Sequence, residues 1–273
     1  MRLYSEYILK RLLSDYVENS ELNVLSKTAG TNTFKPVSPA LWDIIKQSVW
    51  ASQQCQGAFD ISVGSIIKLW RKARKEKVLP DEMLLRNYIQ TFGYQNIILD
   101  SMTYSVKLLQ KNTLLDLGGI AKGYIAQVIV DFCKKEGTEK ALVDAGGDLA
   151  MIGKDWRIGI TIPNSEELMQ GYLLLQNQAV ATSGNMYQFV EIEGKKYSHI
   201  VNPNTGLGLT HQRNVTVIAP NGATADWLAT ACSVLSVKKA LKLIKKMPNC
   251  EVLMMETQKG KLKKWQSKGF VIK

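Results

Sequence analysis

Six short segments of the chain combine Gly, Asp, Ser, Thr and His residues in patterns that could do chemistry. They are G-A-F-D-I-S-V-G (57–64), D-L-G-G-I-A-K-G-Y (116–124), D-A-G-G-D (144–148), A-T-S-G-N (181–185), Y-S-H-I-V-N-P-N-T-G (197–206) and A-T-A-D-W-L-A-T-A (223–231). Loops that carry such residues on a rigid scaffold are frequent sites of binding and catalysis. These residue types suit anion binding, metal binding and acid–base catalysis.

The segment 116–124 has the features of an anion site. The apolar residues Thr113–Leu115 predict a strand that leads into Gly118 and Gly119, and a helix is predicted to follow. Backbone N–H groups at a helix start, together with the helix dipole, favour a phosphate, and Lys122 adds a cation in the first turn. The segment is neither a Walker loop nor G-x-G-x-x-G. Because a Gly-Gly pair is equally typical of an ordinary tight turn, both interpretations stay open.

Asp226 and Thr230 are four residues apart, so on a helix their oxygens lie on the same face. A carboxylate, a hydroxyl and nearby carbonyls are the hard oxygen ligands that suit Mg²⁺. A structural alternative exists, since the helix dipole favours an acidic residue near a helix start and a threonine can bond back to its own helix. The spacing alone favours this alternative.

His199 and His211 are the only histidines, which argues against a zinc site with several His or Cys ligands. His199 lies between a predicted strand and the turn N-P-N-T-G, a loop position where general acid–base residues occur. A structural histidine fits the same position. The chain has no G-x-S-x-G elbow, which argues against a serine hydrolase.

The elements that must position these segments are helices and mostly antiparallel strands. Helices are predicted at 3–16, 39–54, 121–134, 225–235 and 237–246, with Ser38 as the cap of the second. Strands are predicted at 140–143, 156–162, 172–175, 179–182, 189–192, 215–218, 251–256 and 263–272, with a hairpin turn at 193–195. The elements show neither regular β-α-β alternation nor a repeat of about 20–50 residues, so we expect an α+β fold. Because no linker rich in Pro, Gly or Ser divides the chain, we expect one domain over residues 1–273.

The composition is that of a globular protein, with 45% hydrophobic and 22% charged residues among 273. The net charge is +11, from 35 Lys and Arg against 24 Asp and Glu. Basic runs at 71–77, 238–246 and 259–268 could meet a polyanion, but no nucleic-acid motif accompanies them, so solvated lysine faces are the simpler interpretation.

The first residues lack the apolar core of a secretory signal, and no apolar run is long enough to span a membrane. As written, the sequence therefore predicts a cytoplasmic protein, whereas a leader upstream of it would predict export or membrane anchoring. The four cysteines are scattered without a C-x-x-C pair, so we expect free thiols.

In this order the segments resemble the ApbE family, the FAD:protein FMN transferases. The resemblance runs from about Leu12 to Val271 and begins with S-D-Y-V-E-N-S-E-L-N (14–23). It continues through G-A-F-D-x-x-V-G followed by L-W, D-L-G-G-I-A-K-G-Y, A-G-G-D, A-T-S-G, Y-S-H-I-x-x-P-x-T-G and A-D-x-L-A-T-A. Ordered motifs of this number are far more specific than any one alone.

The resemblance implies a Mg²⁺-dependent enzyme that moves FMN from FAD to a Thr or Ser hydroxyl of a target flavoprotein and releases AMP. His199 would be the general base, and Mg²⁺ would be held by Asp226 and Thr230 with backbone oxygens near Gly119 and Ala229. Asp148 would support the site. The residues expected to bind FAD are Phe59, Asp60, Gly64, Leu69, Trp70, Asp116, Lys122, Ser183, His199 and Ile200.

Three departures from the family pattern accompany the resemblance. Members carry an N-terminal strand that ends in an M-G-T-like motif; Met1 falls almost at the first helix, so we expect this strand and its FAD contact to be missing. Asn185 and Asn202 stand where the family usually has Asp. The alternatives are an FAD pyrophosphatase giving FMN and AMP, a non-catalytic FAD-binding protein, and a basic nucleic-acid-binding protein, which would leave the ordered motifs unexplained.

Overall fold

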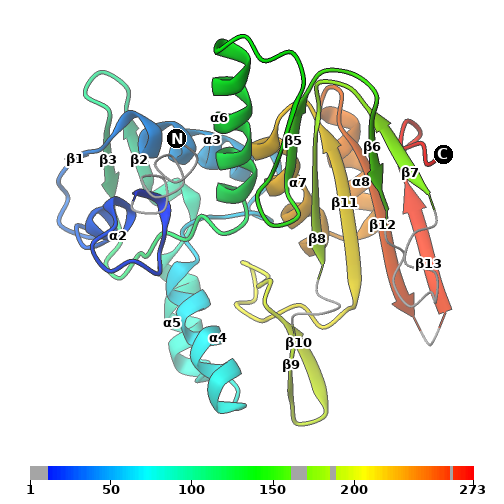
Figure 1. Ribbon diagram of the computed structural model, residues 1–273. Helices are drawn as coiled ribbons and strands as arrows, with labels where there is room; N and C mark the ends of the chain where they lie inside the picture. The colour runs from blue at the N-terminus through cyan, green and yellow to red at the C-terminus, as the bar shows by residue number, and fades with distance from the viewer. Residues whose placement is uncertain (1–11, 161–170, 185–188, 259–260) are drawn as a thin grey trace. The chain divides into compact units, whose positions relative to one another are not determined.

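The computed structural model describes residues 12–160, 171–184, 189–258 and 261–273. The chain forms two compact units, each built from two separate segments: unit 1 comprises Met1–Ala121 and Phe189–Thr210, and unit 2 comprises Lys122–Gln188 and His211–Lys273. Both contain helices and antiparallel strands (Figure 1), which confirms the predicted α+β class. Because each unit uses two segments, no linker separates them, and the single domain over residues 1–273 stays a prediction.

Unit 1 consists of helices around a small sheet and a hairpin. Its helices are α2 (Glu21–Ser26), α3 (Pro39–Gln54), α4 (Gly64–Glu76), α5 (Glu82–Thr91) and the 3₁₀ turn η1 (Tyr94–Asn96). Its strands are β1 (Lys35–Pro36), β2 (Ile97–Asp100) and β3 (Ser105–Leu108), paired in the order β1-β3-β2, and the hairpin β9 (Phe189–Ile192) with β10 (Lys195–Ser198). Ser38 caps α3 by accepting a hydrogen bond from Leu41 N–H, as predicted.

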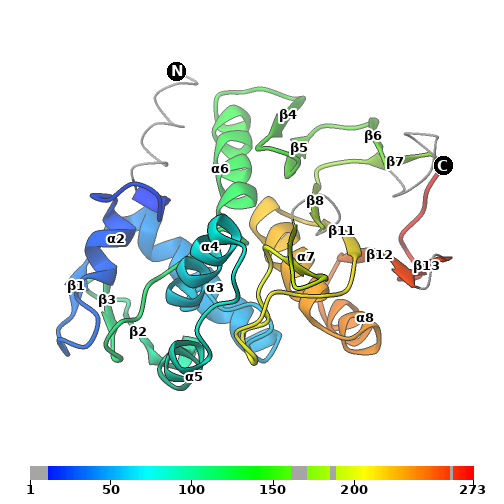
Figure 2. The same cartoon turned by 90° about the horizontal axis from the view of Figure 1, so that it is seen from below.

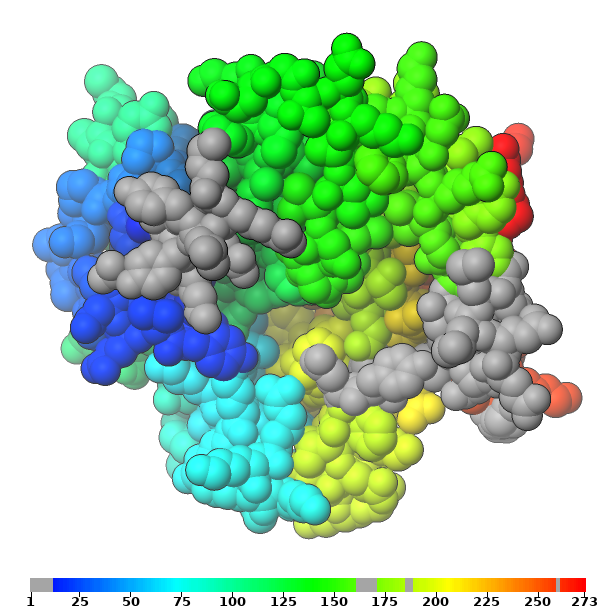
Figure 3. Space-filling model, in the orientation of Figure 1, coloured from blue at the N-terminus to red at the C-terminus, as the bar shows by residue number. Residues whose placement is uncertain are grey.

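The two segments of unit 1 are joined by a hydrophobic cluster. Ile66, Trp70 and Ala73 recur at helical spacing on the inner face of α4 and pack against Val190 and Tyr197 of the β9–β10 hairpin. The opposite face of α4 is charged and lies at the surface, where its atoms are coloured cyan in Figure 3. Burial of this apolar stripe fixes the orientation of α4 and therefore the positions of the side chains that flank the stripe.

Unit 2 is built on a six-stranded antiparallel sheet in the order β13-β12-β11-β8-β5-β4. Its strands are β4 (Ala141–Asp144), β5 (Leu149–Ile152), β8 (Ala179–Gly184), β11 (Arg213–Ala219), β12 (Glu251–Gln258) and β13 (Lys261–Gln266), with a separate hairpin of β6 (Trp156–Gly159) and β7 (Tyr172–Leu175). Its helices are α6 (Ala121–Lys135), α7 (Gly222–Val234) and α8 (Val237–Lys246). Figure 2 shows α7 and α8 on one side of the strands β11 and β12.

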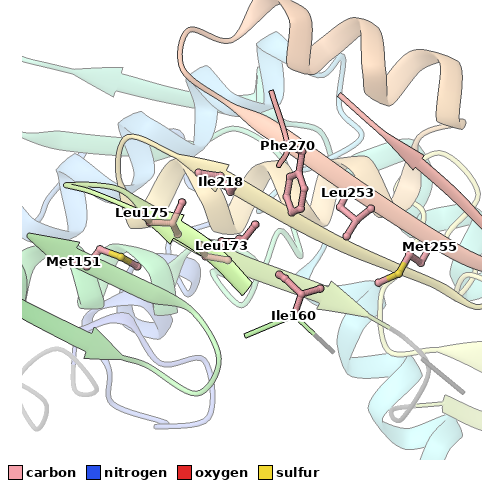
Figure 4. Packing of buried hydrophobic residues seen from close by; sticks show 9 residues of the cluster. Met151, Ile160, Leu173, Leu175, Ile218, Leu253, Met255 and Phe270 are labelled. Carbon is pink, nitrogen blue, oxygen red and sulfur yellow. The ribbon is translucent and has the colours of Figure 1, made fainter. Parts of the chain in front are cut away.

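The other face of this sheet is covered by the β6–β7 hairpin and the C-terminal segment. Leu173 and Leu175 of β7 pack with Leu253 and Met255 of β12 and with the fully buried Phe270 (Figure 4). Helices on one face and a hairpin on the other leave β11 and β12 buried on both sides, so these strands are a rigid support for α7.

Most predicted elements are present, and the main corrections have local causes. The strand predicted at 113–115 is only an isolated parallel bridge between Val63 and Leu114. The last strand ends at Gln266 rather than at 272, because Glu251 accepts hydrogen bonds from Ser267 and from Gly269 N–H and turns the chain there. Elements that the patterns did not predict are α2, α4, α5, β1, β2, β3 and β5.

Some predictions fall outside the described residues or concern single features. Residues 3–11 of the predicted N-terminal helix, residues 161–162 of a predicted strand, and Asn185 lie outside them; residues 14–16 form no helix. The four cysteines are free thiols, as expected. Among the described helices, none has the length and apolar character that crossing a membrane requires.

Candidate active site

Two glycines bring the starts of α6 and α7 together in unit 2. A Cβ at Gly123 would overlap the carbonyl of Gly222, and a Cβ at Gly222 would overlap that of Gly123. Gln127 of α6 also accepts a hydrogen bond from Gly222 N–H at 3.0 Å. Only residues without a side chain allow this approach. As a result Asp226, in the second turn of α7, accepts a hydrogen bond from Gly123 N–H at 3.1 Å.

A second carboxyl and one ammonium complete this cluster. Asp148, just before β5, lies beside Asp226, and the pKa of each carboxyl depends on the other. The ammonium nitrogen of Lys122 is 2.6 Å from Oδ2 of Asp148. The Asp148 side chain is only 3% exposed, whereas Lys122 is half exposed. The cluster Lys122, Asp148 and Asp226, which we call the charge cluster, therefore comes from three segments of unit 2.

The charge cluster has one cation for two buried carboxyls, and their pKa values reflect this. Burial, and then the neighbouring Asp148, raise the pKa of Asp226 well above its ordinary value. Burial also raises the pKa of Asp148, although Lys122 opposes the rise. Burial lowers the pKa of Lys122, but Asp148 and Asp226 outweigh it and the pKa is raised. Two like charges side by side in a buried place favour either a shared proton or an added cation.

The donors of unit 2 suit a hard divalent cation that also binds a substrate phosphate. Among the described residues, no group of three or more His, Cys, Asp and Glu side chains could hold a metal. A cation at Asp226 would therefore need hydroxyl, carbonyl or phosphate ligands as well, which is how proteins usually bind Mg²⁺. Thr230 is one turn further along α7 and supplies a hydroxyl on the same helix face. The buried excess of negative charge and this oxygen set fit Mg²⁺.

The remaining residues predicted for unit 2 differ in what they touch. The carbonyl oxygen of Ala229 accepts a hydrogen bond from the Ser233 hydroxyl inside α7 at 2.9 Å, so this oxygen already has a protein donor. Ser183 is in β8, opposite Val215 of β11 and next to Thr182. Thr182 faces Thr216, their hydroxyl oxygens 3.0 Å apart.

In unit 1, Asp116 organises the turn that precedes α6. Its Oδ1 accepts a hydrogen bond from Gly118 N–H at 2.8 Å, and its Oδ2 lies 3.1 Å from the Arg71 guanidinium. Arg71 also pairs with Asp15 and lies over the ring of Tyr16. Burial and Asp15 raise the pKa of Asp116, while Gly118 N–H and Arg71 lower it. Gly118 is exposed and Gly119 partly exposed, so this turn presents main chain to solvent.

His199 is in a loop of unit 1 whose shape is set by its neighbours. Ile200 N–H donates to the Ser198 hydroxyl, and Leu209 N–H donates to the Ile200 carbonyl at 2.9 Å each. Oδ1 of Asn202 accepts from Asn204 N–H at 3.0 Å and closes the turn. Asparagine makes this Asx turn as aspartate would, so the departure at this position keeps the loop's structure. His199 itself is partly exposed.

Trp70 supports the same loop from α4. Its side chain is 0% exposed, its indole N–H donates to the carbonyl of Gly206 at 2.7 Å, and its ring packs against Tyr197 with centroids 5.2 Å apart. Leu69 is partly buried against the same cluster. Trp70 was expected to contact FAD; its observed contacts are with the protein, beneath the His199 loop.

The segment 57–64 is also occupied with contacts inside unit 1. The carboxylate of Asp60 accepts hydrogen bonds from Ser62 N–H, the Ser62 hydroxyl and Tyr94 N–H, at 2.7–2.8 Å, and burial raises its pKa despite these bonds. Phe59 is buried, and its N–H donates to Cys55 Sγ. Gly64 N–H donates to the carbonyl of Leu114, and a Cβ there would overlap that carbonyl. That these residues bind FAD stays a prediction.

Sequence reasoning therefore found the residues of the charge cluster but missed Arg71 and the glycine contact. Arg71 opens the run R-K-A-R-K-E-K, which is typical of a solvated face. A partial signal was available, because Arg71 directly follows the buried Trp70 on the edge of the apolar stripe of α4. The residues that sequence reasoning named are divided between the units: unit 2 holds Lys122, Asp148, Ser183, Asp226, Ala229 and Thr230, and unit 1 holds the others.

Comparison with known proteins points to one family. The model of the ApbE family matches residues 5–254. A FAD:protein FMN transferase of Klebsiella pneumoniae is 32% identical over 221 residues, which cover 80% of this chain and 70% of the relative. A FAD:protein FMN transferase of Escherichia coli K12 is 28% identical over 272 residues, covering 95% of this chain and 77% of the relative.

Solved structures agree with the sequence comparison. The apo form of the flavinyl transferase ApbE of Pseudomonas stutzeri is similar with a TM-score of 0.86 at 25% identity, covering 98% of this chain and 86% of that one. The ApbE protein of Thermotoga maritima is similar with a TM-score of 0.84 at 27% identity, covering 98% and 90%.

Proposed function

Because the chain belongs to the ApbE family, we propose that it is a FAD:protein FMN transferase, which moves FMN from FAD to a hydroxyl of an acceptor flavoprotein. The observation that carries the proposal is the charge cluster. Lys122, Asp148 and Asp226 belong to three of the motifs that carry the family resemblance, and they pair two buried carboxyls beside one ammonium. That arrangement suits chemistry on a pyrophosphate: the two carboxyls can attract a metal cation, and the ammonium can offset negative charge on the phosphates.

The proposed reaction is a phosphoryl-type transfer. A Thr or Ser hydroxyl oxygen of the acceptor attacks the phosphorus of the FMN half of FAD, the anhydride bond to the AMP half breaks, and AMP leaves with the bridging oxygen. The hydroxyl proton passes to His199, which acts as general base. His199 is partly exposed, and Trp70 supports its loop through the hydrogen bond to the Gly206 carbonyl. This position suits a residue that must contact the hydroxyl of an acceptor protein.

Several residues are proposed to act on the charge of the pyrophosphate. Asp226 and Thr230 would hold Mg²⁺, with backbone oxygens near Gly119 and Ala229 as further ligands. When bound, Mg²⁺ neutralises charge on the phosphate oxygens. Lys122 adds a mobile positive charge, since its half-exposed side chain can leave Asp148 for a phosphate. Asp116 accepts a hydrogen bond from Gly118 N–H and so holds the Gly-rich turn beside which FAD is proposed to bind.

One experiment tests this proposal against its alternatives. The protein is incubated with FAD and MgCl₂, with and without a flavin-acceptor domain that carries a target threonine. Flavin fluorescence that stays with the acceptor on a denaturing gel reports transfer, and chromatography reports AMP. We expect covalent flavin with AMP in equal amount, no AMP without acceptor, and no transfer in EDTA.

The controls separate the other outcomes. An acceptor in which the target threonine is replaced by valine should receive no flavin. AMP and free FMN formed without acceptor would instead identify an FAD pyrophosphatase. Intact FAD that stays bound, with no AMP in either mixture, would identify a flavin-binding protein without catalysis.

A further inference from the structure

The positive charge of this protein is concentrated at the end of unit 2. Residues 237–273 contain eleven lysines and no arginine against two glutamates, a net charge of +9, while the whole chain carries +11. Both glutamates have other partners. Glu256 is buried and pairs with Arg213, and Glu251 accepts hydrogen bonds from Ser267 and Gly269 N–H. The lysines are therefore not neutralised by the acidic residues of their own segment.

Two neighbouring elements display these lysines. On α8 the apolar residues Ala240, Leu243 and Ile244 are buried. The five lysines of α8 are exposed and, at about 100° per residue, fall within an arc of about 120° on the opposite face. We define the lysine surface as these five together with two lysines of β13: Lys238, Lys239, Lys242, Lys245, Lys246, Lys261 and Lys263.

The β13 lysines belong to the same side of the sheet as α8. Lys263 is opposite Glu256 and Lys261 is opposite Gln258 in the antiparallel register of β12 and β13, and paired residues share a face. The alternate residues Leu253 and Met255 face the β6–β7 hairpin, so the even-numbered residues of β12 face the helices (Figure 4). Helix α8 packs on β12, the strand next to β13 (Figure 2). None of the seven lysines lies within ion-pair distance of a described carboxylate.

The chemistry of the lysine surface selects among possible anionic partners. Specific protein interfaces are enriched in Arg and aromatic residues and depleted in Lys. Proteins that recognise nucleic-acid bases do so with Arg, Asn and Gln side chains, and proteins that bind single strands stack the bases on exposed aromatic rings. The lysine surface offers only flexible ammonium groups. Clusters of about 4–8 basic residues without fixed geometry are typical of surfaces that bind anionic lipid headgroups.

We infer that the lysine surface docks the protein onto a membrane rich in anionic phospholipid. The contact is electrostatic, between ammonium groups and a layer of phosphates, and it is independent of the proposed transferase chemistry. It would place the enzyme close to any acceptor protein held in that membrane.

Vesicle binding tests this inference with the full chain. The probes are vesicles of phosphatidylcholine alone and vesicles in which about one third of the lipid is phosphatidylglycerol, sedimented at about 0.15 M NaCl, where the Debye length is about 8 Å. The test variant carries Lys238→Glu, Lys239→Glu and Lys242→Glu. These exposed positions lie in the first half of α8, where acidic residues favour the helix dipole, and a glutamate at 239 completes a capping box with Ser236.

The matched control carries Lys68→Glu, Lys72→Glu and Lys75→Glu on the exposed face of α4, with the same change of net charge. We expect the native chain to bind only the anionic vesicles and to release from them at about 0.5 M NaCl. Each lysine near such a surface contributes about 1 kcal/mol, so the α8 variant should bind about 100-fold more weakly or worse. The α4 control should bind the anionic vesicles less than about 10-fold more weakly than the native chain.

Four results would overturn the inference: no binding of the native chain, equal binding to both kinds of vesicle, unchanged binding of the α8 variant, or an equal loss in the α4 control. Tighter binding to a DNA duplex than to the anionic vesicles would assign the lysine surface to nucleic acid instead. FMN transfer to a soluble acceptor, measured on the same samples, should be unchanged in the α8 variant. Failure of transfer in the native chain would refute the proposed function and leave the vesicle result standing.

Discussion

Replacing Asp226 by asparagine should make the protein more stable and inactive at once. In the charge cluster, Asp226 is buried beside Asp148 with only Lys122 to offset the two carboxyls. An asparagine has nearly the same shape. Its oxygen can accept from Gly123 N–H, so the hydrogen bond of Asp226 is kept, and its NH₂ group can donate to the neighbouring Asp148. Only the charge and the proposed cation site are lost.

The expected gain in stability follows from the direction of the pKa shift. Because the pKa of Asp226 is raised in the folded chain, the folded state holds the proton more tightly than the unfolded state. Protonated Asp226 therefore contributes to the free energy of unfolding. This contribution is complete below the pKa of an unfolded Asp, about 3.9, and is lost as the pH rises through the raised pKa of Asp226 in the folded chain. Relief of such strain at a functional site usually gives about 0.5–2 kcal/mol. For a chain of this size that is a rise in Tm of about 1–8 °C at neutral pH.

Thermal unfolding between about pH 4 and pH 8, without added metal, measures the effect. The difference in Tm between Asp226→Asn and the native chain should be small at the acid end and grow with pH. Asp131→Asn is the control: Asp131 is exposed on α6 and accepts from Gln127, an interaction that asparagine retains, so its Tm should stay nearly constant.

Activity should move in the opposite direction. Loss of an outer-shell partner of a metal site costs about 10–100-fold in activity. FMN transfer by Asp226→Asn should fall by more than this, because Asp226 is proposed as a direct ligand. Adding MgCl₂ with FAD should raise the Tm of the native chain and leave that of the variant unchanged. A lower Tm for Asp226→Asn, or a difference that does not change with pH, would refute this account of the charge cluster.

Three further predictions concern single residues. His199→Ala should lower the single-turnover rate of FMN transfer by about 10²–10⁴-fold while FAD affinity, measured by flavin fluorescence, changes far less; a parallel loss of folding stability would identify a structural histidine. Thr230→Ala should raise the MgCl₂ concentration needed for half-maximal transfer and should recover at saturating MgCl₂, unlike Asp226→Ala, since a neutral hydroxyl is a weaker ligand than a carboxylate. Arg213→Met should destabilise unit 2 by about 3–5 kcal/mol, measured by urea unfolding, because it leaves Glu256 buried without its partner at 2.8 Å. Burial raises the pKa of Glu256, but hydrogen bonds from Gln258 and Arg213 outweigh burial and lower the pKa. The ion pair therefore stabilises the fold above about pH 4.3, and the loss of stability in the variant should shrink as the pH falls below that value.

Elements with strong end signals were predictable from the sequence. Helix α3 begins and ends where the Ser38–Pro39 cap and the apolar spacing place it, and α8 extends over 237–246 as predicted, with Ser236 as its cap. Helix α4 was missed although Ile66, Trp70 and Ala73 have helical spacing, since the motif before it and the basic run after it were interpreted separately. Strand β5 was missed because it has only four residues, Leu149–Ile152, which pair with the neighbouring β4 and with the more distant β8.

The site shows the same limit more sharply. Residue types and motifs were enough to name Lys122, Asp148 and Asp226, but no local pattern could show that Asp148 and Asp226, far apart in sequence, are neighbours in the fold. That contact depends on the pairing of β5 with β8 and on the contact of α6 with α7. Arg71 was hidden for the converse reason: it is surrounded in sequence by solvated cations, and only the fold brings Asp15 and Asp116 to it.

Glycines in the motif D-L-G-G-I-A-K-G-Y illustrate why a motif cannot be interpreted from residue types alone. Gly118 is an exposed turn residue whose N–H donates to Asp116 and so fixes the turn before α6. Gly123, five residues later, is buried against Gly222 and leaves no room for a side chain. Its role is to let α7 approach so that its own N–H reaches Asp226. One motif thus carries both an exposed turn fixed by one carboxylate and the packing contact that positions another.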